Sequence, residues 1–312
     1  MYDIIIIGAG PAGLTSAIYA RRASKNVLVL EAKTYGGQII NTLDIENYPT
    51  QPHISGFDFA TKLYNQAKDL GAEIIIEKVI DIKDNGSEKK VITTKNTYKC
   101  KSIIIATGSD NRKLKIDRED YFLGKGISYC ATCDGSFYKN KVVAIVGGGN
   151  TALEDAVYLS DIASKVYLIH RRNMFNAEAS TIDKIKEKKN VEIIYNSNIS
   201  ELIGKERLTQ IKLTNSENEI KTIDIDGLFI AVGRIPENQN FAKIINLDKA
   251  GYVIAGEDCH TNVDGIFVAG DNRVKKLRQL VTAASDGAIA ATEAVKYLSN
   301  NKWPFCKKKS IF

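Results

Sequence analysis

The chain has 312 residues, of which 44% are hydrophobic and 26% charged, and its formal net charge is +6. This composition is typical of a globular protein with room for two domains, and it excludes a disordered chain. The N-terminal apolar run Ile4–Ile7 is too short for a signal peptide, and no stretch approaches the roughly 18 apolar residues of a membrane helix. We therefore expect a cytoplasmic protein that binds no membrane. The lysines are scattered apart from the run 307–309, so we expect no nucleic-acid binding.

The first predicted unit is a strand, a glycine-rich turn and a helix. Strand Ile4–Ile7 leads into Gly8-Ala9-Gly10-Pro11-Ala12-Gly13, a helix extends to Arg22, and a second strand, Val27–Leu30, ends on Glu31. Such a turn lets the backbone approach a pyrophosphate, which binds at the N-terminus of the helix. Glu31 can accept hydrogen bonds from a free ribose hydroxyl and would repel a 2′-phosphate, so FAD and NAD both fit here.

Downstream, alternating residues predict a small antiparallel sheet. Glu73–Lys83 and Lys90–Thr94 flank a polar turn at residues 84–87, and they lead to strand Ile103–Ile105. The chain then reaches its redox motif.

Cys130-Ala131-Thr132-Cys133-Asp134 is the motif that carries chemistry. Five cysteines in 312 residues argue against a disulfide scaffold, and Cys100, Cys259 and Cys306 are isolated. In a C-x-x-C pair the thiol pKa is often lowered, and Asp134 could move a proton during disulfide exchange. Half of a zinc site and an inert buried pair are the alternatives. For zinc there is no second C-x-x-C and the histidines show no ligand spacing, so we expect no metal.

The segment from Val142 repeats the plan of the first unit. Strand Val142–Val146, the turn Gly147-Gly148-Gly149-Asn150-Thr151-Ala152 and a helix precede strand Val166–Ile169, which ends on His170. Here the acid is absent and Arg171 and Arg172 follow, which suits a 2′-phosphate through charge-assisted contacts. The sequence therefore predicts FAD in the first unit and NADPH in the second, although a basic strand end facing solvent would give the same pattern.

The remaining segments complete the two units. The second copy continues with strands Val191–Tyr195 and Leu208–Thr214 and ends with Leu228–Ile230. A last strand ends in Ala269-Gly270-Asp271, and the helix-like Leu280–Leu298 follows without a fingerprint of its own. We therefore expect an α/β fold of two Rossmann-like three-layer dinucleotide-binding domains, the second inserted into the first. The expected bounds are 1–112 and 246–312 for the FAD domain and 113–245 for the NADPH domain.

These residues resemble the low-molecular-weight thioredoxin reductases, the class II pyridine nucleotide-disulfide oxidoreductases. The resemblance rests on Cys130–Gly135 just ahead of Gly147–Ala152, and further matches span the chain. They are Gly36-Gly37-Gln38, Glu46-Asn47-Tyr48-Pro49, His170-Arg171-Arg172, Ala269-Gly270-Asp271 and Arg278-Gln279.

The resemblance implies roles for individual residues. Cys133 matches the cysteine nearer the flavin, Cys130 the one that attacks thioredoxin, and Asp134 the acid–base residue. The expected FAD-binding residues are Gly8, Gly10, Pro11, Ala12, Gly13, Glu31, Gly36, Gly37, Gln38, Asn47, Val79, Gly108, Gly270, Asp271, Arg278, Gln279 and Leu280. The expected NADPH-binding residues are Gly147, Gly149, Asn150, Thr151, His170, Arg171 and Arg172. The resemblance also implies a homodimer with thioredoxin as its partner, and hinges near residues 113 and 245 that let the NADPH module rotate.

Other functions stay open at this point. Asn176 stands where the family often has a third arginine, so NADH or ferredoxin could be the donor, and another small redox protein could be the acceptor. A redox sensor without turnover would need inert cysteines or a missing nicotinamide site, and the sequence shows neither. Because Cys306 stands alone, no C-terminal redox pair is expected.

Overall fold

The computed structural model describes residues 1–42 and 44–300, so Cys306 and the lysine run 307–309 lie outside the described residues. The chain divides into two compact units, Asn111–Arg234 and the remainder on either side of it. The second unit is therefore inserted into the first. Each unit is an α/β structure built on a mainly parallel sheet.

The second junction differs from the expected boundary at residue 245. Phe241 and Ile245 are both 2% exposed and belong to the core of the first unit, where they pack with Val253 and Ile105. The segment 235–245 is thus held by the first unit through buried apolar contacts. The sequence after the strand Leu228–Ile230 contains no periodic pattern that would have predicted this packing.

The first unit has a sheet whose parallel strands run in the order β3, β2, β1, β6, β17. On the side of β6 away from β1, its first half pairs with β5 in antiparallel orientation and its second half pairs with β17 in parallel orientation. Strands β5 and β4 form an antiparallel hairpin. The bounds are β1 (Tyr2–Ile7), β2 (Val27–Glu31), β3 (Glu73–Ile76), β4 (Val79–Asn85), β5 (Glu88–Thr93), β6 (Thr97–Ile105) and β17 (Ile266–Val268).

Alternate residues of the central strands fill two cores, one on each face of this sheet. Ile4 and Ile6 face the helices, whereas Ile5 and Ile7 face β4, β5 and the segment around Phe241. This follows from the two-residue period of a strand, and burial on both faces explains the unbroken apolar run. The helices of the unit are α1 (Pro11–Arg22), α2 (Gly56–Asp69) and α7 (Leu280–Asn300), with the 3₁₀ turns η1 (Gly37–Asn41) and η3 (Gln239–Phe241).

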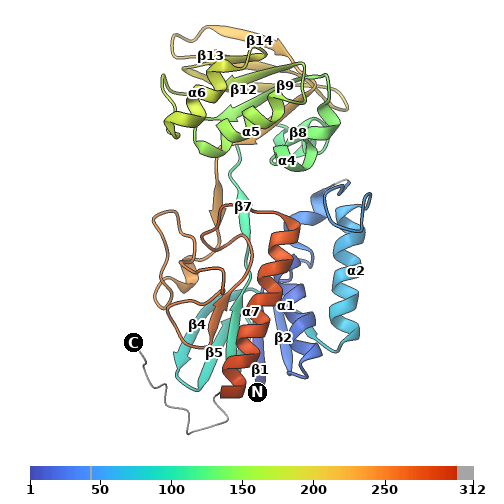
Figure 1. The fold of residues 1–312 in the computed structure, drawn as a ribbon, viewed down its shortest axis with the longest axis vertical. Coiled ribbons are helices and arrows are strands. Elements are labelled where there is room, and N and C mark those ends of the chain that lie inside the picture. Colours follow the sequence, from blue (N-terminus) through green and yellow to red (C-terminus); the bar gives the residue numbers. More distant parts are fainter. Residues whose placement is uncertain (43, 301–312) are drawn as a thin grey trace. The chain divides into compact units, whose positions relative to one another are not determined.

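Helices α1 and α7 lie directly against each other (Figure 1). A Cβ atom at Gly287 of α7 would lie 2.3 Å from the carbonyl oxygen of Ala12, so only glycine permits this approach. Ala290, Ala291 and Ala294 continue the small-residue face of α7 into the core. This contact brings the C-terminal helix to the start of α1.

The second unit repeats the plan with its own parallel sheet and a separate antiparallel one. The parallel order is β11, β10, β9, β15, β8, and the antiparallel order is β12, β13, β14. The parallel strands are β8 (Ile127–Ser128), β9 (Val142–Gly147), β10 (Lys165–Ile169), β11 (Val191–Ile194) and β15 (Gly227–Ala231). The antiparallel strands are β12 (Ser197–Gly204), β13 (Leu208–Asn215) and β14 (Ile220–Asp224). Its helices are α3 (Glu119–Phe122), α4 (Ala131–Asp134), α5 (Asn150–Ser160) and α6 (Ala179–Glu187), with the 3₁₀ turn η2 (Gly135–Tyr138).

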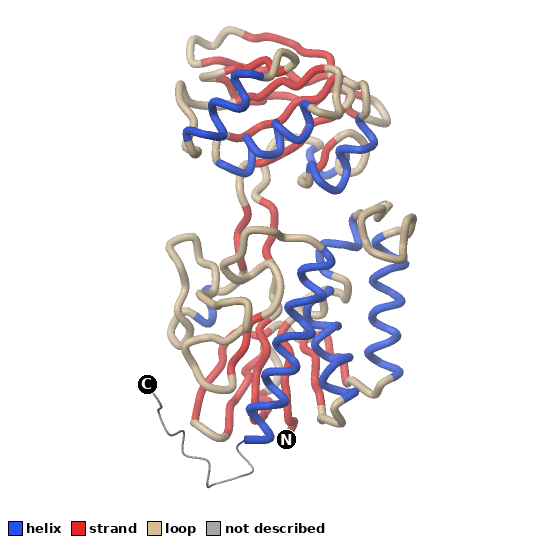
Figure 2. Tube along the Cα trace, in the orientation of Figure 1, coloured by secondary structure: helices blue, strands red, loops and turns tan. Residues whose placement is uncertain are grey.

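The fifth parallel strand has a different origin in each unit. In the first unit it is β17, which follows the insertion, and in the second it is β8, which precedes the glycine turn. The two segments where the chain crosses between units, β7 (Ser109–Asn111) and β16 (Arg234–Pro236), pair with each other as two strands (Figure 2).

Within the described part of the chain, no helix combines the length and apolar character needed to cross a bilayer.

Candidate active site

Cys130 and Cys133 form a disulfide, with their Cα atoms 5.3 Å apart. Strand β8 delivers the chain to Cys130, which precedes the single helical turn α4. The backbone N–H groups of Cys133 and Asp134 both donate to the carbonyl oxygen of Cys130, at 3.3 and 3.1 Å. This turn fixes the spacing of the two cysteines and places the Asp134 side chain directly after them.

The Asp134 carboxylate accepts a hydrogen bond from the Ser128 hydroxyl at 2.6 Å. Burial raises the pKa of Asp134 above its usual value, and the Ser128 donor acts in the opposite direction. A carboxyl group whose pKa is raised toward neutrality is suited to acid–base work. Asp134 belongs to the sequence motif, whereas Ser128 could not be predicted, because a serine in a strand carries no motif.

A second carboxylate, that of Glu119, links the segment that precedes β8 to the residue that follows β8. Glu119 is 4% exposed and accepts hydrogen bonds from the Tyr129 hydroxyl at 2.5 Å and from the N–H groups of Leu114 and Lys115. Burial first, and then the Glu119 carboxylate, raise the pKa of Tyr129 well above its usual value. Tyr129, next to Cys130, is therefore fixed in its neutral, donating form.

The first glycine turn forms a close-packed cradle at the start of α1. A Cβ at Gly13 would lie 1.9 Å from the Gly8 carbonyl oxygen, and one at Gly37 would lie 3.2 Å from the Gly10 Cα. Gly10 caps α1 without a side-chain acceptor, and the first turn carries no acidic residue. Unsatisfied N–H groups and the helix dipole at this end suit the pyrophosphate of a dinucleotide.

Glu31 lies at the end of β2, beside this cradle. Its carboxylate accepts hydrogen bonds from the N–H groups of Ala9 at 2.8 Å and Lys33 at 2.9 Å. These bonds fix the acid where the adenosine ribose lies in dinucleotide-binding folds. The residues present therefore fit FAD.

The other expected FAD residues come from four segments of the first unit. Asn47 donates to Gln279 at 3.3 Å, the Arg278 guanidinium donates to the carbonyl oxygen of Asp271, and Gln38 donates to Asp110 at 2.5 Å. A Cβ at Gly270 would lie 2.9 Å from the Ala12 side chain, so the loop after β17 touches the start of α1.

Three further expected FAD residues lie elsewhere in the first unit. Val79 opens β4 and is 7% exposed, Gly108 follows β6 with a φ of +68°, and Leu280 opens α7. The main chain of Gly108 has open space where a Cβ would be. Their FAD contacts stay a prediction.

The second glycine turn repeats the cradle at the start of α5. Gly149 caps α5 without a side-chain acceptor and without acidic residues in the first turn, as at α1. The Asn150 side chain accepts the N–H of Glu178 at 2.8 Å, and the Gly148 carbonyl oxygen accepts the N–H of Asn176. The loop after β10 is thus held against the turn, and the residues fit a second dinucleotide. Thr151 is exposed in the first turn of α5.

His170 and the two arginines after it have different surroundings. His170 is 8% exposed, its Nε2 lies 3.0 Å from the Met174 carbonyl oxygen, and its ring occupies the space that a side chain on Gly148 would need. Burial lowers the pKa of His170, so this imidazole is neutral at pH 7. Arg171 and Arg172 are exposed, and among the described residues no carboxylate forms an ion pair with them. The charge for a 2′-phosphate would come from these guanidinium groups.

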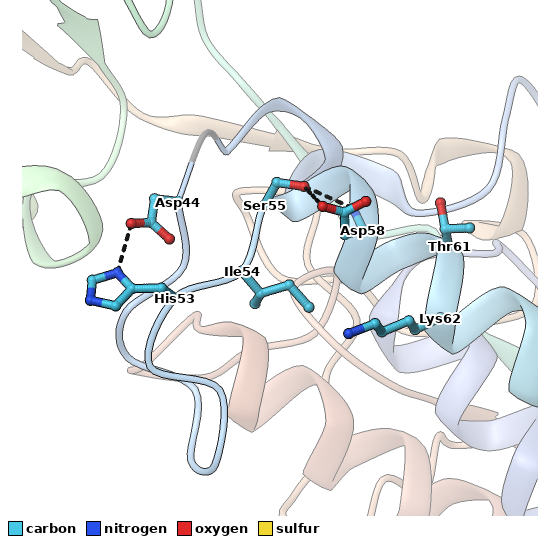
Figure 3. A pocket seen from close by; sticks show the side chains of 7 residues that line it. All are labelled: Asp44, His53, Ile54, Ser55, Asp58, Thr61 and Lys62. Atoms are coloured by element: carbon cyan, nitrogen blue, oxygen red, sulfur yellow. Dashed lines mark hydrogen bonds and ion pairs between the residues drawn. The ribbon is translucent and has the colours of Figure 1, made fainter.

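A third polar cluster was not visible in the sequence. The hairpin around the Ile45–Ile54 bridge brings His53 within 2.9 Å of Asp44, with Glu46 close by. Beside it, an open pocket of about 520 Å³ extends to the start of α2 (Figure 3). The His53 ring is exposed to solvent, so these ion pairs are screened and contribute little to stability.

Comparisons with known proteins agree with this geometry. The sequence profile of the pyridine nucleotide-disulphide oxidoreductases matches residues 2–287. A thioredoxin reductase of Listeria innocua is 41% identical over 304 residues, which cover 97% of this chain and 95% of the relative. One from Mycoplasma genitalium is 42% identical over 293 residues, 93% of each chain.

A solved structure gives the same result for the fold. The crystal structure of thioredoxin reductase from Streptococcus pyogenes superimposes with a TM-score of 0.92 at 38% identity, over 96% of this chain and 99% of the other. The chain therefore belongs to the pyridine nucleotide-disulphide oxidoreductase family, as a thioredoxin reductase within it.

Proposed function

We propose that this chain uses the electrons of NADPH, supplied through bound FAD, to reduce its Cys130–Cys133 disulfide and then the disulfide of thioredoxin. The observation that carries the proposal is the disulfide itself, formed beside a partly buried carboxyl group in a chain with two dinucleotide-binding units. The two units would give each nucleotide a cradle of its own.

The first unit would hold FAD through its glycine cradle and Glu31. The second would hold NADPH through the start of α5, with Arg171 and Arg172 toward the 2′-phosphate. FAD, when bound, supplies two-electron chemistry that links a nicotinamide to a disulfide. His170 would support the second turn by packing on Gly148 rather than by charge.

The chemistry of the cysteine pair can be written so that electrons and protons balance. Two electrons break the Cys130–Cys133 bond and give two thiolates, and neutral Asp134 gives its proton to one of them. The remaining thiolate attacks the thioredoxin disulfide, forms a mixed disulfide and releases one thioredoxin thiolate. The second cysteine, deprotonated by Asp134, then attacks the mixed disulfide, restores the Cys130–Cys133 bond and releases the second thioredoxin thiolate. The two thioredoxin thiolates take up protons from solvent, so that reduced thioredoxin leaves as the dithiol.

Following the family resemblance, Cys130 is the attacking residue and Cys133 the one nearer the flavin. The Cys130 N–H is already engaged by Ser128, which fixes the main chain at the start of the helical turn. We also propose that the protein acts in the cytoplasm as a homodimer. Five cysteines with a single C-x-x-C support a reducing compartment.

Replacing either cysteine of the pair by serine tests this function. In Cys130→Ser and Cys133→Ser, thioredoxin-dependent reduction of a disulfide by NADPH should be lost, while the bound flavin is still bleached by NADPH without oxygen. Cys100→Ala is the matched control, because this buried thiol lies in β6 outside the site, and it should keep the activity. Activity that persists in both serine variants would reject the dithiol pathway.

A further inference from the structure

The Ser128 hydroxyl lies between the Cys130 main chain and the Asp134 side chain. It accepts the Cys130 N–H at 3.0 Å, lies 2.6 Å from Asp134 Oδ2 and lies 3.3 Å from the Cys130 carbonyl oxygen. Ser128 is 3% exposed, and its strand β8 is held by parallel pairing with β15. The paired strand thus presents one hydroxyl to three polar groups of the redox turn.

A serine hydroxyl has one hydrogen to donate and two lone pairs that accept. When Asp134 is ionised, the hydrogen goes to its carboxylate and one lone pair takes the Cys130 N–H. When Asp134 is protonated, the acid can donate to the second lone pair, and the hydroxyl can turn its hydrogen to the Cys130 carbonyl oxygen. All partners are then satisfied in both states, without movement of a heavy atom.

We propose that Ser128 is a positioning residue for Asp134, whose hydroxyl reverses its hydrogen bond as Asp134 gains and loses its proton. This inference rests on the proposed function, since Asp134 has its acid–base role there. If a buried carboxyl group had a hydrogen-bond partner in only one of its two protonation states, that protonation state would be favoured too strongly for the group both to give and to take a proton. The hydroxyl removes this obstacle.

Other ionisable groups near α4 must be separated from Asp134 in any titration. The pKa of Tyr138 in η2 is raised by burial first and by the charge of Asp134 second. The charge of Asp226 also raises this pKa, and the charge of Arg207 lowers it. Helix α5, which packs on α4, carries Glu154 and Asp155, and burial followed by the charge of Glu154 raises the pKa of Asp155 to about 6. Asp155 would therefore titrate within the pH range of the experiment described next.

The experiment is a pH titration of the Asp134 carboxyl group by infrared difference spectroscopy on the oxidised, FAD-containing protein. The band that disappears in Asp134→Asn identifies the group, and Asp155→Asn assigns the band near pH 6. Ser128→Ala is compared with Ser128→Thr, which keeps the hydroxyl, and with Ser160→Ala, whose hydroxyl donates to Val157 on α5. The pH profile of thioredoxin reduction is measured in parallel.

In Ser128→Ala we expect the Asp134 titration and the pH profile to shift together to higher pH, because the ionised form loses a charge-assisted hydrogen bond whereas the protonated form loses a weaker neutral one. The protonation equilibrium should change by about tenfold, as expected for one hydrogen bond to a charged group. Ser128→Thr should restore the wild-type titration, and Ser160→Ala should match wild type. An unshifted Asp134 band in Ser128→Ala, or a shift that threonine fails to reverse, would overturn the inference. The infrared titration needs no turnover, so it is independent of the cysteine variants that test the proposed function.

Discussion

The buried carboxylate of Asp286 on α7 organises the loop that leads from β17 to α7. It accepts hydrogen bonds from the Gly270 N–H at 2.9 Å, from two nitrogens of the Arg273 guanidinium at 2.8 and 2.9 Å, and from the Lys275 ammonium at 2.9 Å. The Asp286, Arg273 and Lys275 side chains are only 3%, 2% and 5% exposed. Asp286→Ala would leave two buried cations without their shared partner.

The expected loss of stability is about 3–5 kcal/mol, the cost of removing one partner from a buried ion pair. The free energy of unfolding is measured by urea denaturation, with release of the flavin as the signal. Glu293→Ala on the same helix is the matched control, because its ion pairs with Lys296 and His260 are exposed and are worth about 0–1 kcal/mol. If Asp286→Ala costs no more than Glu293→Ala, the loop is not held by this carboxylate.

The same variant has a defined pH dependence. Burial alone would raise the pKa of Asp286, but the donors Arg273 and Lys275 and the Gly270 N–H lower it below its usual value. A carboxyl group with a lowered pKa in the folded state contributes stability that is complete above its unfolded pKa of about 3.9. The difference in stability between wild type and Asp286→Ala should therefore be constant near neutrality and should shrink as the pH falls below that value.

Two further predictions concern the nucleotides. Gly13→Ala should abolish flavin retention, measured by the absorbance of the purified protein, because its Cβ would overlap the Gly8 carbonyl oxygen at 1.9 Å. Gly86→Ala is the control: it strains the turn between β4 and β5, where φ is +77°, but it meets no atom within 4 Å and should stay yellow. Arg171→Ala should lower kcat/KM for NADPH by about 10- to 100-fold, from the loss of one charged hydrogen bond, and leave NADH little changed. Equal effects on NADPH and NADH would show that Arg171 does not contact the 2′-phosphate.

The repeated glycine turns made the architecture predictable from the sequence. Each turn follows a buried apolar strand and opens a helix, so β1, α1, β9 and α5 could be placed from local pattern alone. Two features could not. The stretch Glu73–Lys83 resembled one strand, but it is β3 and β4, separated where the buried Glu77 binds Thr93 and Asn96. Strand β12 was missed because a bulge between Ile199 and Glu201 breaks the two-residue alternation of its apolar side chains.

The candidate site was predictable only where a motif marks it. Cys130, Cys133 and Asp134 are adjacent in the chain, so their association needs no knowledge of the fold. Ser128 depends on the register of β8, and Glu119 depends on contacts with Tyr129 that a sequence does not display. His170 shows the opposite case: its position after β10 suggested a phosphate contact, and only packing against Gly148 reveals that its ring is buried.

The separate origin of β8 and β17 places the disulfide at a defined position of the repeated plan. Ile127 pairs with Leu228 as Ile266 pairs with Ile103, so counting along both strands aligns Cys130 with Ala269 and Cys133 with Asn272. The cysteine pair therefore stands on the loop that in the other copy carries the predicted flavin ligand Asp271. The same position at the carboxyl edge of the parallel sheet thus carries a predicted flavin ligand in the first unit and the redox disulfide in the second.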